Sequence, residues 1–170
     1  SQWSGIEVTD VTSDSSSVMP GSLFVALQGL NRHGAEFVDE ALKLGAIAVL
    51  TDREGEKLIT DRSIPIITVS RPEVDLGHLA HWFYGNPMDH MHAVGITGTN
   101  GKTTTTTLLY EIWQAAGFTS ALMGTVATRM PGIEIEAART TESADLIARR
   151  CAQMSALHVR SLAMEVSSHG

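Results

Sequence analysis

A glycine-rich loop, Gly-Thr-Asn-Gly-Lys-Thr-Thr at residues 98–104, constrains the fold of this chain more than any other feature. The segment at residues 92–96 precedes it and predicts a strand, and residues 102–116 follow it with the spacing of a helix that ends at Gly117. A strand, a glycine-rich loop and a helix in this order are the context that a phosphate-binding loop (P-loop) needs. We therefore predict an α/β fold with a parallel sheet that binds a nucleoside triphosphate.

The residue types in this loop suit phosphate binding. The two glycines let the backbone curl around an anion so that its N–H groups point inward. The lysine reaches the β- and γ-phosphates, and the hydroxyl that follows it is a ligand for Mg²⁺. The strict pattern has a glycine where this chain has Ile96, so the loop is a variant, and the alternative is a turn that only caps a helix. The predicted nucleotide-binding residues are Gly98, Thr99, Asn100, Gly101, Lys102, Thr103 and Thr104, with ATP and Mg²⁺ as cofactors.

An acid that binds the metal is expected at the end of a neighbouring apolar strand. Residues 159–166 predict such a strand, and Glu165 follows its apolar residues. We predict that Glu165 binds the metal together with Thr103; the alternative is an ordinary surface acid at a strand end. Lys102 and Glu165 are then the predicted catalytic residues.

Strands alternate with helices along the rest of the chain. Predicted strands cover residues 23–27, 46–51, 66–69 and 118–123, and predicted helices cover 36–44, 73–84 and 141–157, the last with Thr141 as its N-cap. This alternation indicates βαβ units and a largely parallel sheet. Because the pattern restarts after Gly85-Asn86-Pro87, we predict a small N-terminal α/β domain at residues 1–88 and the first part of a P-loop ATPase domain at 89–170. The chain stops directly after a strand, so we expect a fragment of a longer protein.

Composition argues against several other classes of function. The net charge of −7 argues against a nucleic-acid-binding surface, which needs clustered Lys and Arg. Cys151 is the only cysteine, and no apolar run approaches the roughly 20 residues that span a bilayer, so we expect a cytoplasmic protein without disulfides or membrane insertion. The pairs His78/His81 and His90/His92 lack a third ligand at a useful spacing, which argues against structural zinc.

Several segments resemble the Mur ligases, the ATP-dependent ligases of bacterial cell-wall synthesis. The loop at 98–104 and the sequence MEVSSHG at 164–170 resemble this family, and most closely its MurE branch. Residues 20–27 (PGSLFVAL), 33–38 (HGAEFV) and 124–126 (GTV) also resemble family stretches. Two positions depart from the family, since Ser16 replaces a usual arginine and Glu142 replaces a proline or glycine after the pair Thr140-Thr141.

The resemblance implies a three-domain ligase of which this chain holds the first domain and part of the second. ATP would phosphorylate a carboxylate of UDP-N-acetylmuramoyl-L-alanyl-D-glutamate, and a diamino acid would attack the acyl phosphate to form an amide. We expect a monomer, and no ligase turnover by the fragment alone. The resemblance implies that Ser13, Ser15, Leu30, Asn31 and Arg32 contact the uridine and pyrophosphate, and that Thr140, Thr141 and Ser167 contact the muramyl peptide.

Other interpretations stay open at this point. Ser13 and Ser15 are typical turn formers, Thr141 is a possible helix cap, and Arg32 is a possible solvated loop charge. His169 either orients a phosphate or metal ligand or is structural. For the whole chain, the alternatives are a ligase of the MurF branch, a folylpolyglutamate synthase, and a non-catalytic P-loop nucleotide-binding module.

Overall fold

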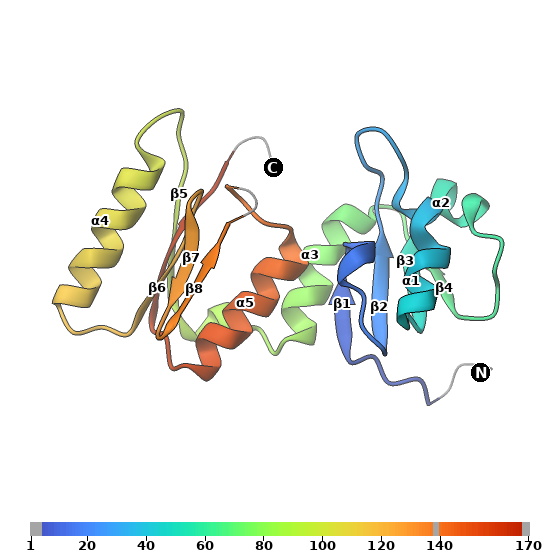
Figure 1. Ribbon diagram of the computed structural model, residues 1–170, viewed down its shortest axis with the longest axis horizontal. Coiled ribbons are helices and arrows are strands. Elements are labelled where there is room, and N and C mark those ends of the chain that lie inside the picture. The colour runs from blue at the N-terminus through green and yellow to red at the C-terminus, as the bar shows by residue number, and fades with distance from the viewer. Residues whose placement is uncertain (1–4, 138–139, 168–170) are drawn as a thin grey trace. The chain divides into compact units, whose positions relative to one another are not determined.

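The computed structural model describes residues 5–137 and 140–167, and the chain divides into two compact units, Ser1–Phe83 and Tyr84–Gly170 (Figure 1). Each unit has its own α/β sheet and its own apolar core, as the fold class predicted from the sequence requires. The boundary expected after residue 88 lies inside the short 3-10 helix η3 (Pro87–His90), which belongs to the second unit. His169 lies outside the described residues.

The first unit is built on a four-stranded sheet in which all strands are parallel, in the order β1-β2-β3-β4. Every residue of β2 and β3 is buried, which is typical of central strands in a parallel sheet. Phe24 and Val49 on these strands pack with Val38 and Ala41 of α1. The elements are β1 (Asp10–Thr12), η1 (Ser15–Ser17), β2 (Ser22–Ala26), η2 (Gly34–Phe37), α1 (Val38–Leu44), β3 (Ala48–Thr51), α2 (Arg53–Leu58), β4 (Ile66–Thr68) and α3 (Pro72–Phe83).

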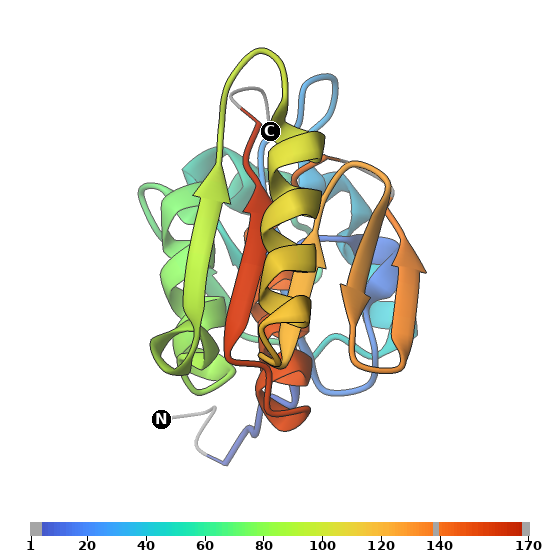
Figure 2. The same ribbon diagram turned by 90° about the vertical axis from the view of Figure 1, so that its left-hand side faces the viewer.

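The second unit has a five-stranded sheet in the order β5-β9-β6-β7-β8. Figure 2 shows β9 between β5 and β6, with α4 lying against these strands. β9 is parallel to both of its neighbours, whereas β7 and β8 form an antiparallel hairpin. After η3, the elements are β5 (His92–Ile96), α4 (Lys102–Ala115), β6 (Ser120–Met123), β7 (Ala127–Met130), β8 (Ile133–Glu136), α5 (Ala144–Ala156) and β9 (Ser161–Glu165).

The longer helices and strands lie close to the ranges predicted from the sequence, and the prediction differs from the structure mainly at short elements. Gly45 adopts φ +105° at the end of α1, and its N–H bonds the carbonyls of Ala41 and Leu42, as expected for a C-terminal cap. β1, α2 and the β7–β8 hairpin were not predicted. The expectation that Thr141 caps a helix is wrong, because α5 begins at Ala144 with Ser143 at its N-cap position.

Two features are absent from the part of the chain that the structure describes. In residues 5–137 and 140–167, no helix is long and apolar enough to cross a membrane. Over the same ranges, no three His, Cys, Asp or Glu side chains come together in a group that could hold a metal ion.

Candidate functional site

The glycine-rich loop joins the end of β5 to the first residue of α4. Gly98 and Gly101 adopt φ values of +142° and +80°, which glycine tolerates and other residues rarely adopt. Lys102 is the first residue of the 14-residue helix α4, and its Nζ donates to the carbonyl oxygen of Gly98 at 2.7 Å. Curled backbone, helix N-terminus and ammonium group therefore lie together, which suits an anion. The remaining predicted loop residues, Thr99, Asn100 and Thr104, are exposed.

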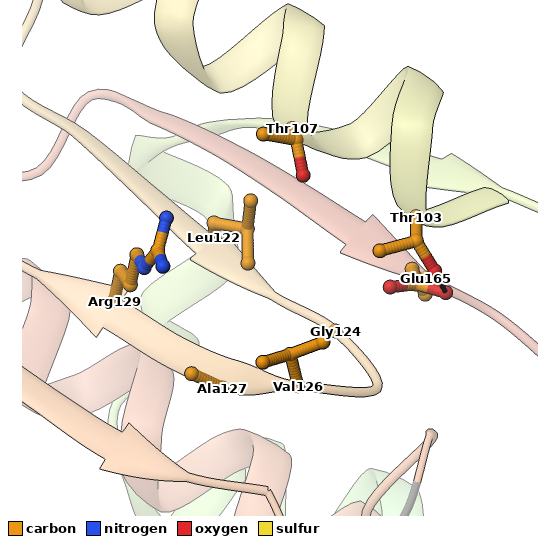
Figure 3. A pocket seen from close by; sticks show the side chains of 8 residues that line it. All are labelled: Thr103, Thr107, Leu122, Gly124, Val126, Ala127, Arg129 and Glu165. Atoms are coloured by element: carbon orange, nitrogen blue, oxygen red, sulfur yellow. Dashed lines mark hydrogen bonds between the residues drawn. The ribbon is translucent and has the colours of Figure 1, made fainter.

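β9 brings Glu165 to the same end of the sheet as this loop. Glu165 is in register with Ile96, the last residue of β5, because the two strands are parallel. The Thr103 hydroxyl donates to Glu165 Oε2 at 3.1 Å (Figure 3), although the two residues are 62 positions apart. Glu165 is only 1% exposed, so the alternative of an ordinary surface acid is wrong.

A third segment, Gly124-Thr125, surrounds the same carboxylate. The Thr125 backbone N–H donates to Glu165 Oε1 at 3.0 Å, and the Thr125 hydroxyl donates to Oε2 at 3.0 Å. Gly124 lies so close that a Cβ atom at this position would collide with Glu165 Oε1. Sequence reasoning noted these residues as part of a GTV match but gave them no role, because nothing local to them points to an acid 40 residues away.

The carboxylate borders a cavity of about 160 Å³ between α4 and strands β6 and β7 (Figure 3). Its lining residues are Thr103, Thr107, Leu122, Gly124, Val126, Ala127, Arg129 and Glu165. Mg²⁺ prefers oxygen ligands, and it is usually held by one or two carboxylates with waters and substrate phosphates completing its shell. The Thr103 hydroxyl and the Glu165 carboxylate fit that donor set, and the phosphate loop beside them would present the phosphates.

The residues expected on the muramyl-peptide side lie next to the same carboxylate. The Thr141 hydroxyl accepts from the Ser167 backbone N–H at 2.8 Å and lies 3.2 Å from the Ser167 hydroxyl. Because the Thr141 hydroxyl bonds to the segment after β9, it does not cap α5. The Thr140 hydroxyl lies 3.3 Å from the Thr125 hydroxyl. The second unit thus gathers Thr140, Thr141 and Ser167 around the end of β9.

The residues expected to contact the nucleotide sugar lie in the first unit, in two loops. Ser13 follows β1 and Ser15 begins η1, while Leu30, Asn31 and Arg32 form an exposed loop after β2. Since β1 and β2 are parallel neighbours, both loops leave the same edge of the sheet. Ligands of open α/β sheets bind outside the carboxyl ends of the strands. Asp14 accepts from the Ser16 backbone N–H at 2.9 Å, so the Asp14 side chain forms the turn here, and the interpretation of Ser13 and Ser15 as turn formers stays a prediction.

A buried histidine fixes the second of these loops. His33 is 5% exposed; its Nδ1 accepts from the Ala35 N–H at 3.0 Å, and its Nε2 lies 3.2 Å from Asp52 Oδ1. Because Nδ1 is an acceptor, the proton is on Nε2, which donates to Asp52. The Asp52 carboxylate also accepts from the Gly55 N–H at 2.7 Å. Sequence reasoning missed this anchor, although the spacing of His33 and Glu36 follows the capping-box pattern seen at helix starts.

Arg32 does not extend freely into solvent. Its guanidinium lies 4.7 Å from the centroid of the Phe37 ring, and it pairs with Glu36 at 2.7 Å. The hydrogen bond from Arg32 lowers the pKa of Glu36 below its ordinary value. The interpretation of Arg32 as a solvated loop charge is therefore incomplete, since local contacts orient its side chain.

Comparisons with known proteins agree with these two halves. The family profile described as "Mur ligase family, catalytic domain" matches residues 7–84, and the profile "Mur ligase middle domain" matches residues 96–170. Proteins named UDP-N-acetylmuramoyl-L-alanyl-D-glutamate--2,6-diaminopimelate ligase from Streptomyces avermitilis and Bacillus cereus are 42% and 36% identical over 163 residues. These matches cover 96% of this chain, which spans 32% of each relative, or about a third of its length.

Solved structures show the same fold. A structure of a ligase with that name aligns with a TM-score of 0.73 at 23% identity, over 96% of this chain and 32% of the other. The MurF ligase from Thermotoga maritima in complex with ADP aligns with a TM-score of 0.59 at 24% identity, over 95% of this chain and 32% of the other. At these identities the structural likeness concerns the fold alone.

Proposed function

The chain belongs to the Mur ligase family, and on this premise we propose that it is part of an ATP-dependent ligase that adds a diamino acid to UDP-N-acetylmuramoyl-L-alanyl-D-glutamate. One observation carries the proposal: the phosphate loop and the buried Glu165 meet through the 3.1 Å bond from Thr103. The ligase names of the relatives at 34–42% identity support the choice of substrate. Those names make 2,6-diaminopimelate the first amine to test, with L-lysine as the alternative.

In this proposal the two halves of the chain have different tasks. Residues 1–88 bind the uridine and pyrophosphate of the substrate through Ser13, Ser15 and the loop Leu30-Asn31-Arg32. Residues 89–170 form the first part of the ATP-binding domain, in which Thr140, Thr141 and Ser167 contact the muramyl peptide. The proposed ligase acts in the cytoplasm as a monomer, and turnover requires parts of the relatives that this chain does not span.

The proposed reaction begins at the phosphate loop. The D-glutamate carboxylate attacks the γ-phosphorus of ATP, and the bond between that phosphorus and ADP breaks. The product is an acyl phosphate with an electrophilic carbonyl carbon. The amine of the diamino acid attacks this carbon, and phosphate leaves as the amide forms. The loop N–H groups bind the phosphates, and the Lys102 ammonium stabilises the charge on the transferred phosphoryl group. Thr103 and Glu165 would hold Mg²⁺, which when bound neutralises phosphate charge.

The test is phosphate release by the full-length ligase that contains this chain. The assay supplies Mg-ATP and UDP-N-acetylmuramoyl-L-alanyl-D-glutamate with either meso-diaminopimelate or L-lysine. We expect release that depends on the dipeptide substrate and on one of the two amines. Release only with the corresponding tripeptide substrate and D-alanyl-D-alanine would move the assignment to the MurF branch.

A binding measurement on this chain separates a ligase from a non-catalytic nucleotide-binding module. We expect UDP-N-acetylmuramoyl-L-alanyl-D-glutamate to raise the melting temperature, since a ligand specific to the native state stabilises it. A shift with Mg-ADP but none with the UDP-linked dipeptide at millimolar concentration would favour the module.

A further inference from the structure

We propose that Gly124-Thr125 is a cradle that positions the Glu165 carboxylate, and that the Thr125 hydroxyl couples this carboxylate to Thr140. This inference rests on the proposed function, because the cradle matters if Glu165 holds a metal and Thr140 contacts substrate. In this scheme Thr125 is a positioning residue, since it touches the metal-binding carboxylate rather than the reacting atoms.

The hydrogen bonds to Glu165 come mainly from Thr125. Oε1 accepts from the Thr125 N–H, and Oε2 accepts from the Thr125 and Thr103 hydroxyls, at 3.0, 3.0 and 3.1 Å. Two of these three bonds therefore come from one residue, one to each carboxylate oxygen. Such a pair fixes the rotation of the carboxylate plane, and hydrogen bonds of this kind orient metal-binding carboxylates.

Glycine at position 124 is what permits this arrangement. Glu165 Oε1 lies where a Cβ atom of residue 124 would have to be, so any side chain there would push the carboxylate away. The displaced oxygen is the one that accepts the Thr125 N–H. The pair Gly-Thr at the end of β6 therefore fits the carboxylate as a unit, with the glycine providing space and the threonine providing both donors.

The Thr125 hydroxyl also links the carboxylate to the substrate side. It lies 3.0 Å from Glu165 Oε2 and 3.3 Å from the Thr140 hydroxyl, and it has one proton to donate. An ionised carboxylate is the stronger acceptor, so the proton goes to Glu165 and Thr140 donates to Thr125. A substrate group that binds the Thr140 hydroxyl therefore alters the hydrogen bond from Thr140 to Thr125, whose own hydroxyl donates to the carboxylate. We expect metal–nucleotide binding and dipeptide binding to be coupled through this hydroxyl.

The experiment measures Mn²⁺ affinity by electron paramagnetic resonance in the full-length ligase with ADP, with and without UDP-N-acetylmuramoyl-L-alanyl-D-glutamate. Thr125→Val removes the hydroxyl but keeps the backbone N–H and the branched shape. We expect Mn²⁺ affinity to fall about tenfold, the lower range for loss of a group that orients a metal ligand.

Three further variants sharpen this test. Thr125→Ser restores the hydroxyl and should recover most of the affinity, whereas Gly124→Ala should lower Mn²⁺ affinity at least as much as Thr125→Val. Thr119→Val, an exposed position, is the matched control.

Thr140→Val tests the coupling separately, and it covers the case in which Thr125→Val does not fold. It leaves the cradle intact, so we expect Mn²⁺ affinity without the dipeptide to stay near that of wild type. Because Thr140 also contacts the dipeptide in the proposed function, the effect of the dipeptide is measured at concentrations that saturate the variant, and we expect that effect to disappear. Mn²⁺ affinity within twofold of wild type in Thr125→Val would overturn the positioning role. Coupling that is absent in wild type, or that persists in Thr140→Val, would overturn the link. A wild-type ligase that binds no Mn-ADP would instead refute the proposed function.

Discussion

Each unit holds its candidate ligand loop in place with a buried polar side chain, a histidine in the first unit and a glutamate in the second. In the first unit, the neutral ring of His33 has a partner on each nitrogen, the Ala35 N–H and Asp52, so the anchor is complete within the fold. In the second unit, Glu165 collects three donors but also borders a cavity beside the phosphate loop. The comparison separates a group that holds a loop in place from a group available to a ligand.

The strands β2 and β5 differ in burial. All five residues of β2 are buried, whereas in β5, the strand that leads into the phosphate loop, no residue is fully buried. Apolar burial supplies most of the stability of a fold, at about 25 cal/mol per Å². We therefore expect substitutions in β2 to reduce stability more than substitutions in β5, and substitutions of the exposed glycine-rich loop to affect chemistry.

The largest effect should come from the core of the first unit. Phe24 on β2 is 1% exposed, so Phe24→Ala leaves a cavity and should lower the free energy of unfolding of that unit by about 3–5 kcal/mol. Val94 on β5 is 40% exposed, and Val94→Ala should cost well under about 1 kcal/mol. Urea denaturation followed by circular dichroism measures both. Equal losses would mean that β2 and β5 do not differ in burial as described.

Lys102→Ala should separate chemistry from folding. In the proposed reaction the Lys102 ammonium binds the transferred phosphoryl group, so its loss should lower phosphate release by the full-length ligase about 10²–10³-fold. The melting temperature should stay close to that of wild type, because alanine suits the first turn of α4. Lys57→Ala removes an exposed lysine of the first unit that pairs with Glu54, and it is the control for charge. A Lys102 variant that keeps more than a tenth of wild-type release would contradict the phosphate-loop role.

A smaller loss should follow from loosening the histidine anchor. His33→Asn keeps a side-chain acceptor for the Ala35 N–H, and asparagine is a good N-cap residue. It loses the hydrogen bond to Asp52, which should cost about 1–2 kcal/mol. His33→Ala loses both bonds and should cost more. Urea denaturation ranks the variants, and an asparagine variant no more stable than the alanine variant would show that the capping bond contributes nothing.

The sequence predicts the parts of these sites that depend on local pattern. A strand, glycines, a lysine and a helix follow each other directly, so the phosphate loop could be recognised, and strand-end position pointed to Glu165 as its partner. The cradle could not be predicted, because it depends on β6 pairing with β9 across 40 intervening positions. The same holds for His33 and Asp52, which are 19 positions apart. The β7–β8 hairpin was missed because its strands are short, with Thr128 and Arg129 inside β7.

Acid should destabilise the first unit in part through Asp52. The Gly55 backbone N–H, with a further contribution from His33, holds the pKa of Asp52 below its ordinary value of 3.8 against the opposing effect of burial. A carboxyl group whose pKa is lower in the folded state stabilises the fold above its ordinary pKa, and this contribution is lost as pH falls through the folded value. Unfolding free energy should therefore decline below about pH 4. The pKa values of Glu36 and Asp61 are also lowered, so the comparison with Asp52→Asn isolates one group. A wild-type acid profile parallel to that of Asp52→Asn would show that this carboxylate does not contribute.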